Sequence, residues 1–130
     1  MNSILAIIQT YSLLYNVDPR VIEAIVKVES DYNPVAVSSK GAVGLMQIIP
    51  KYAHKTKKQL LDPETNIHEG IKLLLKIKQE CVHKDNFTFV VCYSLGSPKG
   101  NKVKHPTKFF YYKQFIKEYE NAKNQTLQIR

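Results

Sequence analysis

Glu29 has the residue type and the setting expected of a proton donor. Read as a helix at 100° per residue, the segment after Asp18 places three aliphatic residues within about 60° of Glu29, and these are Ile22, Ile25 and Val26. The polar residues Arg20, Glu23 and Lys27 point to the other side. A carboxylate on an apolar stripe is partly desolvated, which raises its pKa toward the range of a general acid. The alternative is that Glu29 meets solvent at the core's edge or pairs with a lysine, and for a lone glutamate this alternative is favoured.

A long motif starts at this glutamate and favours the proton donor over the alternative. The chain reads ESDYNPVAVSSKGAVGLMQIIP from Glu29 to Pro50, which resembles the active-site motif of the lytic transglycosylase family related to goose-type lysozyme. The matching positions are Glu29, Ser30, Asn33, Pro34, Ala36, Ser38, Gly41, Ala42, Gly44, Leu45, Met46, Gln47 and Pro50. Three less specific segments stand in the family's order: YNVDP from Tyr15, DPETNIHEG from Asp62 and the segment Tyr93 to Gly96. The resemblance implies the catalytic domain of a soluble lytic transglycosylase, with an all-α, lysozyme-like fold.

The resemblance also implies roles for individual residues. Glu29 would protonate the oxygen of the β-1,4 bond between N-acetylmuramic acid and N-acetylglucosamine in peptidoglycan, and later take a proton back. Ser38 would hold the muramoyl N-acetyl group, while Gln47 and Tyr93 would line the glycan groove. Met46 is a weaker candidate for substrate contact, because a flexible thioether more often fills a gap in the core. Gly41 and Gly44 are expected to let the backbone turn.

No carboxylate near Glu29 in the sequence is placed to act as its partner, although a glycosidase ordinarily uses two. Asp31 is two residues away and would point elsewhere on a continued helix. A single acid fits a route in which the N-acetyl carbonyl assists and the muramoyl 6-hydroxyl closes onto C1, giving a 1,6-anhydro product. If Asp62, Glu64 or Glu69 approached Glu29 in the fold, water could be activated instead. Hydrolytic muramidase activity is therefore the nearest alternative.

Two positions depart from the family pattern. Ser94 stands where the family usually has an asparagine, and Leu73 where a tyrosine is common. These departures concern the substrate groove and leave the reaction class unchanged.

Composition predicts one domain over residues 1–130, with a polar C-terminal tail from about residue 121. The formal net charge of +8 favours polyanionic partners such as the bacterial wall, but charge alone does not select one. No nucleic-acid-binding motif accompanies the charge, so nucleic-acid binding is not expected. The remaining alternative is a wall-binding component of a phage tail or secretion machine with little turnover. Retention of Glu29 argues against binding alone.

The remaining chemistry-bearing residues predict no cofactor and no metal site. Cys81 and Cys92 match no metal or redox spacing and are either buried thiols or one pair. The apolar N-terminus lacks the basic start and cleavage site of a signal peptide, and no run is long enough for a membrane span. We expect a monomer that acts in the periplasm or cell wall, delivered by a phage or already trimmed of its signal.

Periodicity and caps predict a mostly helical chain. Helices are expected over 3–15, from an Asp18 cap to about 30, from an Asp62 cap to about 80, and from Pro106 onward. Residues 31–40 should form a loop, followed by a short helix in the apolar stretch that ends at Pro50. A buried helix capped by Asp85 or Asn86 should run through Leu95, although its composition would also suit a strand. Residues 96–100 read as a loop.

Overall fold

The computed structural model describes residues 3–129, and the side chains as far as residue 125. Within that range the chain forms helices joined by loops, with only isolated β-bridges, which confirms the predicted all-α class. The elements are α1 (Ile4–Leu14), α2 (Pro19–Ser30), α3 (Pro50–Ala53), α4 (Lys57–Leu60), α5 (Pro63–Glu80), the 3-10 turn η1 (Asp85–Phe87), α6 (Val90–Leu95), α7 (Ser97–Gly100), the 3-10 turn η2 (Pro106–Lys108) and α8 (Phe110–Ile129). None of the helices in this range combines the length and apolarity that a membrane span requires.

The two caps expected from Asp-Pro pairs are both present. The Asp18 carboxylate accepts a hydrogen bond from the Arg20 backbone N–H, and Pro19 occupies the first turn of α2. The Asp62 carboxylate accepts one from the Thr65 N–H at the start of α5. These caps fix where α2 and α5 begin, and so which of their residues face the core.

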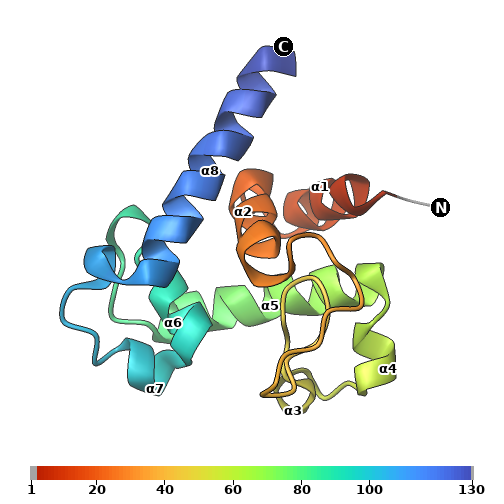
Figure 1. Ribbon diagram of the computed structural model, residues 1–130, viewed down its shortest axis with the longest axis horizontal. Coiled ribbons are helices and arrows are strands. Elements are labelled where there is room, and N and C mark those ends of the chain that lie inside the picture. The colour runs from red at the N-terminus through yellow and green to blue at the C-terminus, as the bar shows by residue number, and fades with distance from the viewer. Residues whose placement is uncertain (1–2, 130) are drawn as a thin grey trace.

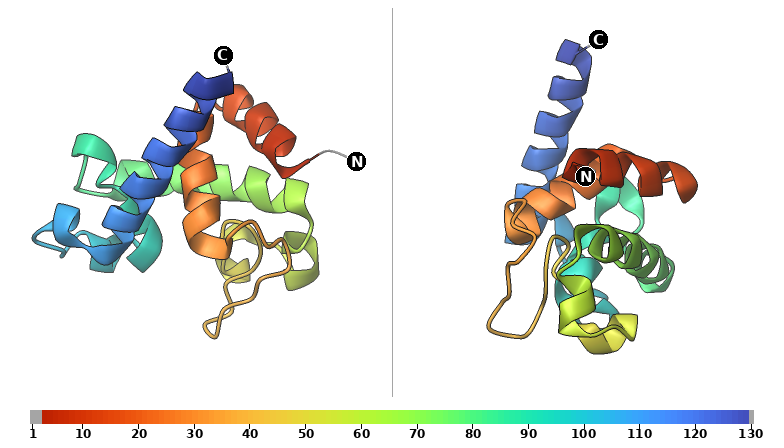
Figure 2. Two further views of the ribbon diagram at one scale, coloured as in Figure 1. Left: turned by 45° about the horizontal axis from the view of Figure 1, so that its top comes forward. Right: turned by 90° about the vertical axis from the view of Figure 1, so that its right-hand side faces the viewer.

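The core forms around α5, which crosses the middle of the molecule between the α1 and α6 sides (Figure 1). Its inner face carries Ile67, Ile71 and Leu74, each at most 2% exposed. Helix α8 packs along α2, and Phe115 from α8 is completely buried. The C-terminal half of α8 projects past the other helices (Figure 1). The long loop between α2 and α3 extends from the end of α2 on another side (Figure 2).

The structure corrects the prediction for the apolar stretch that ends at Pro50. Residues 43–48 form a turn closed by two backbone hydrogen bonds between Val43 and Ile48, and the short helix α3 starts at Pro50 instead of ending there. Gly44 and Gln47 both have positive φ, at 77° and 52°, which interrupts any helix. A Cβ on Gly44 would lie 2.3 Å from the Asn66 amide nitrogen. Glycine is therefore required at position 44 for two reasons, its positive φ and the lack of space for a side chain.

The C-terminal third also differs in detail from the prediction. Helix α6 starts at Val90 without a cap from Asp85 or Asn86, because Asn86 has a left-handed backbone inside η1. The strand alternative for this segment is wrong. Residues 97–100 form a helical turn, and Pro106 opens η2 while α8 starts at Phe110. The polar tail from residue 121 continues α8 as helix.

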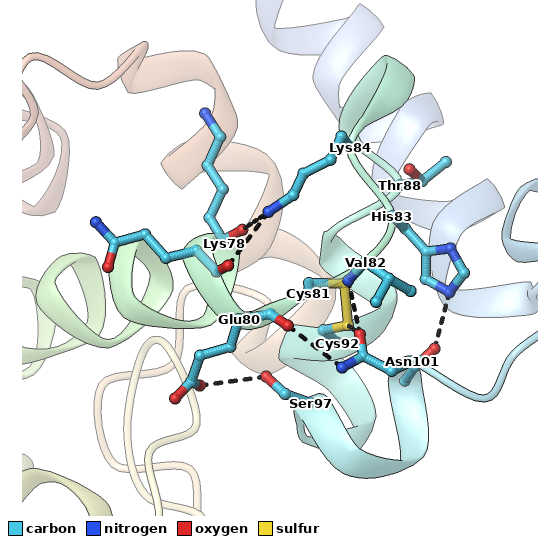
Figure 3. The surroundings of a disulfide bond; sticks show 12 residues. Lys78, Glu80, Cys81, Val82, His83, Lys84, Thr88, Cys92, Ser97 and Asn101 are labelled. Carbon is cyan, nitrogen blue, oxygen red and sulfur yellow. Dashed lines mark hydrogen bonds between the residues drawn. A yellow bond between two sulfur atoms is a disulfide. The ribbon is translucent and has the colours of Figure 1, made fainter.

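Cys81 and Cys92 form a disulfide, which resolves the choice between free thiols and a pair. The bond joins the end of α5 to α6 (Figure 3). Nearby, the Asn101 side-chain oxygen accepts a hydrogen bond from the Val82 N–H at 2.7 Å. The segment that leads into α6 is therefore held covalently as well as by hydrogen bonds.

Candidate active site

Glu29 lies in the last turn of α2, where its helix turns the carboxyl toward apolar neighbours. Ile22, Ile25 and Val26 on the same face are all 0% exposed, as the helical spacing predicted. Glu29 itself is half-buried. Burial raises the pKa of this carboxyl to about 7, and a hydrogen bond from Tyr111 acts in the opposite direction. Near neutral pH the group therefore exists as both acid and carboxylate.

Tyr111 is the direct partner of Glu29 and was missed in the sequence. Its hydroxyl donates a hydrogen bond of 2.7 Å to Glu29 Oε2 from the first turn of α8. Burial raises the Tyr111 pKa well above the ordinary value, and the charge of Glu29 adds to this. The phenol therefore stays protonated as a donor. The two residues are 82 positions apart, and only their helices' packing brings them together.

The backbone of Met46 is clamped from both sides beside this pair. Its N–H donates to the Asn66 side-chain oxygen at 2.8 Å, and its carbonyl accepts from the Tyr93 hydroxyl at 2.6 Å. Asn66 is 1% exposed and also donates to the carbonyls of Val43 and Leu60. Asn66 was not singled out in the sequence, although it lies in the segment DPETNIHEG that resembles the family. The buried Asn66 amide thus fixes the loop between α2 and α3 against α4 and α5.

Tyr93, Glu29 and Tyr111 form one group of interacting side chains, called the active-site cluster below. Burial raises the Tyr93 pKa well above the ordinary value, and the next contribution is the charge of Glu29. The phenol ring therefore lies within electrostatic reach of the carboxyl. Its hydroxyl is already engaged by the Met46 carbonyl, so its first role is to hold the loop.

Ser38 and Gln47 lie within the loop and are bonded to its backbone. The Ser38 hydroxyl oxygen accepts from the Ala42 N–H at 3.0 Å and the Lys40 N–H at 3.3 Å. The Gln47 side-chain nitrogen donates to the carbonyls of Ala36 and Gly44 at 3.2 and 3.0 Å. Both side chains shape the loop, and Glu29 contacts neither by a hydrogen bond.

Met46 points into the core. Its side chain is 0% exposed, and a Cβ on Gly70 of α5 would lie 2.3 Å from its sulfur. The side chain thus fills the space left by a glycine on the facing helix. We propose no substrate contact for it.

The acids considered as second carboxylates gather elsewhere. Asp62, Glu64 and Glu69 line a hollow of about 250 Å³ with Tyr11 and His68. Asp62 caps α5, Glu64 accepts a hydrogen bond from Tyr11, and Glu69 pairs with Lys72.

Asp31 is exposed and forms an ion pair with Lys27. Only burial and the Tyr111 hydrogen bond shift the pKa of Glu29, so no other carboxylate among the described residues is electrostatically coupled to it. A second hollow, of about 490 Å³ between α2 and α8, is likewise not lined by Glu29. The groove expected at Glu29 therefore stays a prediction.

Comparison with known proteins places this arrangement in a family. The family model described as Transglycosylase SLT domain matches residues 6–116. The chain is 33% identical over 88 residues to membrane-bound lytic murein transglycosylase C of Mannheimia succiniciproducens, covering 58% of this chain and 25% of that protein. It is 42% identical over 91 residues to the transglycosylase of Enterobacteria phage PRD1, covering 69% of this chain and 34% of that protein.

A solved structure shares the fold. The 70 kDa soluble lytic transglycosylase SLT70 of Escherichia coli matches 91% of this chain with a TM-score of 0.65 and 25% identity. This match confirms the predicted lysozyme-like fold. The chain covers 21% of that structure, and a quarter to a third of the two relatives above. Because the family model covers most of its length, the chain belongs to the transglycosylase SLT domain family.

Proposed function

We propose that this chain is a peptidoglycan lytic transglycosylase that cleaves the β-1,4 bond between N-acetylmuramic acid and N-acetylglucosamine. The observation that carries the proposal is the Glu29 carboxyl, which has a pKa of about 7 and a hydrogen bond from Tyr111. A group that exists in both protonation states near neutral pH can act as an acid and then as a base. The names of two relatives, a lytic murein transglycosylase and a soluble lytic transglycosylase, support the same reaction.

In the first step neutral Glu29 donates its proton to the glycosidic oxygen as the bond from that oxygen to C1 of the muramoyl residue breaks. The resulting carboxylate is stabilised by the hydrogen bond from Tyr111. In the second step the muramoyl 6-hydroxyl attacks C1 and transfers its proton to the Glu29 carboxylate. The product is a 1,6-anhydromuramoyl end, no water is consumed, and the acid is regenerated.

The isolation of Glu29 from other carboxylates supports the anhydro route. A two-carboxylate glycosidase needs its second group within several ångströms of the sugar, and no described carboxylate is coupled to Glu29. The positive charge that develops at C1 would then be stabilised by the substrate's own N-acetyl carbonyl. The Ser38 oxygen already accepts two backbone N–H groups, so its hydrogen is available to orient that carbonyl.

Tyr93 and Gln47 are proposed to line the glycan groove. Tyr93 is half-buried beside Glu29, so an exposed part of its ring can face a sugar. Gln47 uses its nitrogen within the loop, which leaves its side-chain oxygen as an acceptor for a sugar hydroxyl. Because both residues also hold the loop, their replacement would alter its shape.

The site of action proposed is the periplasm or cell wall, by phage delivery or after signal removal. The disulfide supports it, since such bonds persist mainly in oxidising compartments. A single core shared by α1, α2, α5, α6 and α8 supports one catalytic domain, which we propose acts as a monomer. Assembly with a phage tail or secretion machine is compatible with this location.

Digestion of purified peptidoglycan followed by mass spectrometry of the products tests the reaction. Anhydromuramoyl ends, lighter by one water than reducing ends, are the expected products. Reducing ends would establish a muramidase, and the absence of products would favour the wall-binding component.

The matched variants are Glu29→Gln and Glu64→Gln. The first should lose at least about a hundredfold in rate, since it removes the general acid. The second should retain near-normal activity, because Glu64 lies in the separate hollow. Near-normal turnover by Glu29→Gln would refute the role given to this residue.

A further inference from the structure

The positive charge of the chain is concentrated in one segment. Between residues 86 and 117 there are six lysines, no arginine and no acidic residue, so all eleven acidic side chains lie elsewhere. The remainder of the chain is therefore close to electrical balance. These lysines, called the lysine surface below, are Lys99, Lys102, Lys104, Lys108, Lys113 and Lys117.

The lysine surface has no internal neutralisation. All six lysines are exposed. The ion pairs among the described residues, Arg20 with Asp18, Lys27 with Asp31 and Lys72 with Glu69, involve none of them. Unpaired like charges repel one another, which costs stability, and a bound anion would offset this cost.

The segment that carries this surface also carries a residue of the candidate active site, Tyr111, and directly follows helix α6, which carries another. It runs through α7, the following loop, η2 and the first half of α8, which lie together on the α6 side of the molecule (Figure 1). Helix α6 carries Tyr93 and the start of α8 carries Tyr111, the two phenols whose pKa values the Glu29 charge raises. Four of the six lysines lie between these two phenols in the chain, and the other two follow Tyr111 on α8.

The residue type indicates what kind of anion fits. Arginine binds a single carboxylate or phosphate in a fixed two-pronged geometry, whereas lysine acts as a mobile point charge. Six lysines without an arginine suit several anionic groups spaced along a flexible chain. A glycan strand with peptide stems offers such spacing, because each stem carries free carboxylates.

We propose that the lysine surface binds the stem-peptide carboxylates of the strand that is cut. The inference rests on the proposed function for the identity of the substrate. Binding here is long-range and weakly directional, so it lowers KM and leaves kcat nearly unchanged. It also weakens as salt screens the charges.

Binding is measured first, with Glu29→Gln protein so that no cleavage interferes. In that background, Lys102→Gln/Lys104→Gln/Lys108→Gln is compared with Lys57→Gln/Lys58→Gln/Lys76→Gln, which removes equal charge from exposed lysines outside this surface. At low salt the first set should bind purified peptidoglycan at least about fivefold more weakly, and the second set should bind almost normally. Equal losses in both sets would overturn the proposal.

The chemical source of the anion is tested on the substrate. Amidation of the stem carboxylates, or removal of the stems, should weaken binding of the unmodified lysine surface to the level of the triple variant. Unchanged binding to amidated peptidoglycan would overturn the proposal, as would a loss confined to anionic lipid vesicles or phosphate polymers. Failure of the proposed function is seen separately, as the absence of anhydromuramoyl products from the wild-type protein.

Discussion

The pKa of Glu29 is the balance of two opposing effects on one carboxyl group. Burial among Ile22, Ile25 and Val26 favours the neutral acid, while the Tyr111 hydroxyl favours the carboxylate by donating a hydrogen bond. Burial is the larger effect, and the pKa rises to about 7. A glutamate in water would be almost fully ionised at that pH and would make a poor proton donor.

Tyr111→Phe should move the pH dependence of cleavage upward. Removal of the donor leaves burial unopposed, so the pKa of Glu29 rises further and its acid form persists to higher pH. The basic limb of the pH–rate profile should shift by about 0.5 to 1 pH unit, because a hydrogen bond to a charged acceptor exceeds one to a neutral acceptor by roughly 1 kcal/mol. Rates of peptidoglycan cleavage between pH 5 and 9 measure the shift.

Tyr112→Phe is the matched control for this variant. Tyr112 is the next residue on α8, and its hydroxyl donates to the Asn86 carbonyl at 2.9 Å, away from Glu29. Its profile should coincide with that of the wild type. If both variants shifted the profile equally, the cause would be a general disturbance of α8 and the hydrogen bond to Glu29 would have no special effect.

At the scale of elements, the active-site cluster depends on how α6 is attached to the rest of the molecule. Helix α6 is only six residues long, too short to be stable alone, yet it carries Tyr93. The Cys81–Cys92 disulfide ties it to the end of α5 (Figure 3). Cys92 directly precedes Tyr93 in the sequence. The Tyr93 hydroxyl in turn donates a hydrogen bond to the Met46 carbonyl, which links α6 to the loop between α2 and α3.

Replacement of both cysteines by serine should destabilise the protein by about 3 kcal/mol, the loop-closure value for a loop of this size. The bonded residues are 11 positions apart in the sequence. Urea unfolding with and without a reducing agent measures the difference. The reductant should lower the midpoint of the wild type to that of the double variant and leave the variant unchanged. Equal midpoints for oxidised wild type and the variant would show that the bond contributes nothing.

At the scale of the whole molecule, the features that were predicted correctly are those that depend on residues close together in the chain. The caps Asp18 and Asp62 and the apolar stripe beneath Glu29 follow from local spacing, and all three are present. The motif from Glu29 to Pro50 predicted the fold through its resemblance to a known family, and its positions lie within one continuous segment. The turn at residues 43–48 was missed because Gln47 has a positive φ, which its residue type does not predict.

The contacts that complete the site could not be predicted because they join distant elements. Tyr111 was one of several aromatic residues in the last helix, and nothing local distinguished it from Tyr112. Only the packing of α8 along α2 selects it as the partner of Glu29. Asn66 likewise looked like an ordinary polar residue, although its buried amide holds Met46, Val43 and Leu60.

The elevated pKa of Glu29 lowers the stability of the whole molecule at neutral and alkaline pH. The folded-state pKa of about 7 exceeds the reference value of 4.5, so between these values the folded state binds more protons than the unfolded state. Below pH 4.5 the group is neutral in both states and imposes no penalty. As pH rises through 7, the buried group ionises and stability is lost, by at most about 3 kcal/mol.

Glu29→Gln should therefore be more stable than the wild type at pH 8, by about 1 to 3 kcal/mol, and nearly equal at pH 4. The amide stays neutral at every pH, and its oxygen can still accept the hydrogen bond from Tyr111. Thermal and urea unfolding at both pH values measure the difference, in which the titration of all other groups cancels. Glu120→Gln, at an exposed position on α8, should show no such pH-dependent gain. If Glu29→Gln were no more stable than the wild type at pH 8, the ionised Glu29 carboxylate would not be destabilised by burial. The physical basis of its role as a neutral acid would then be lost.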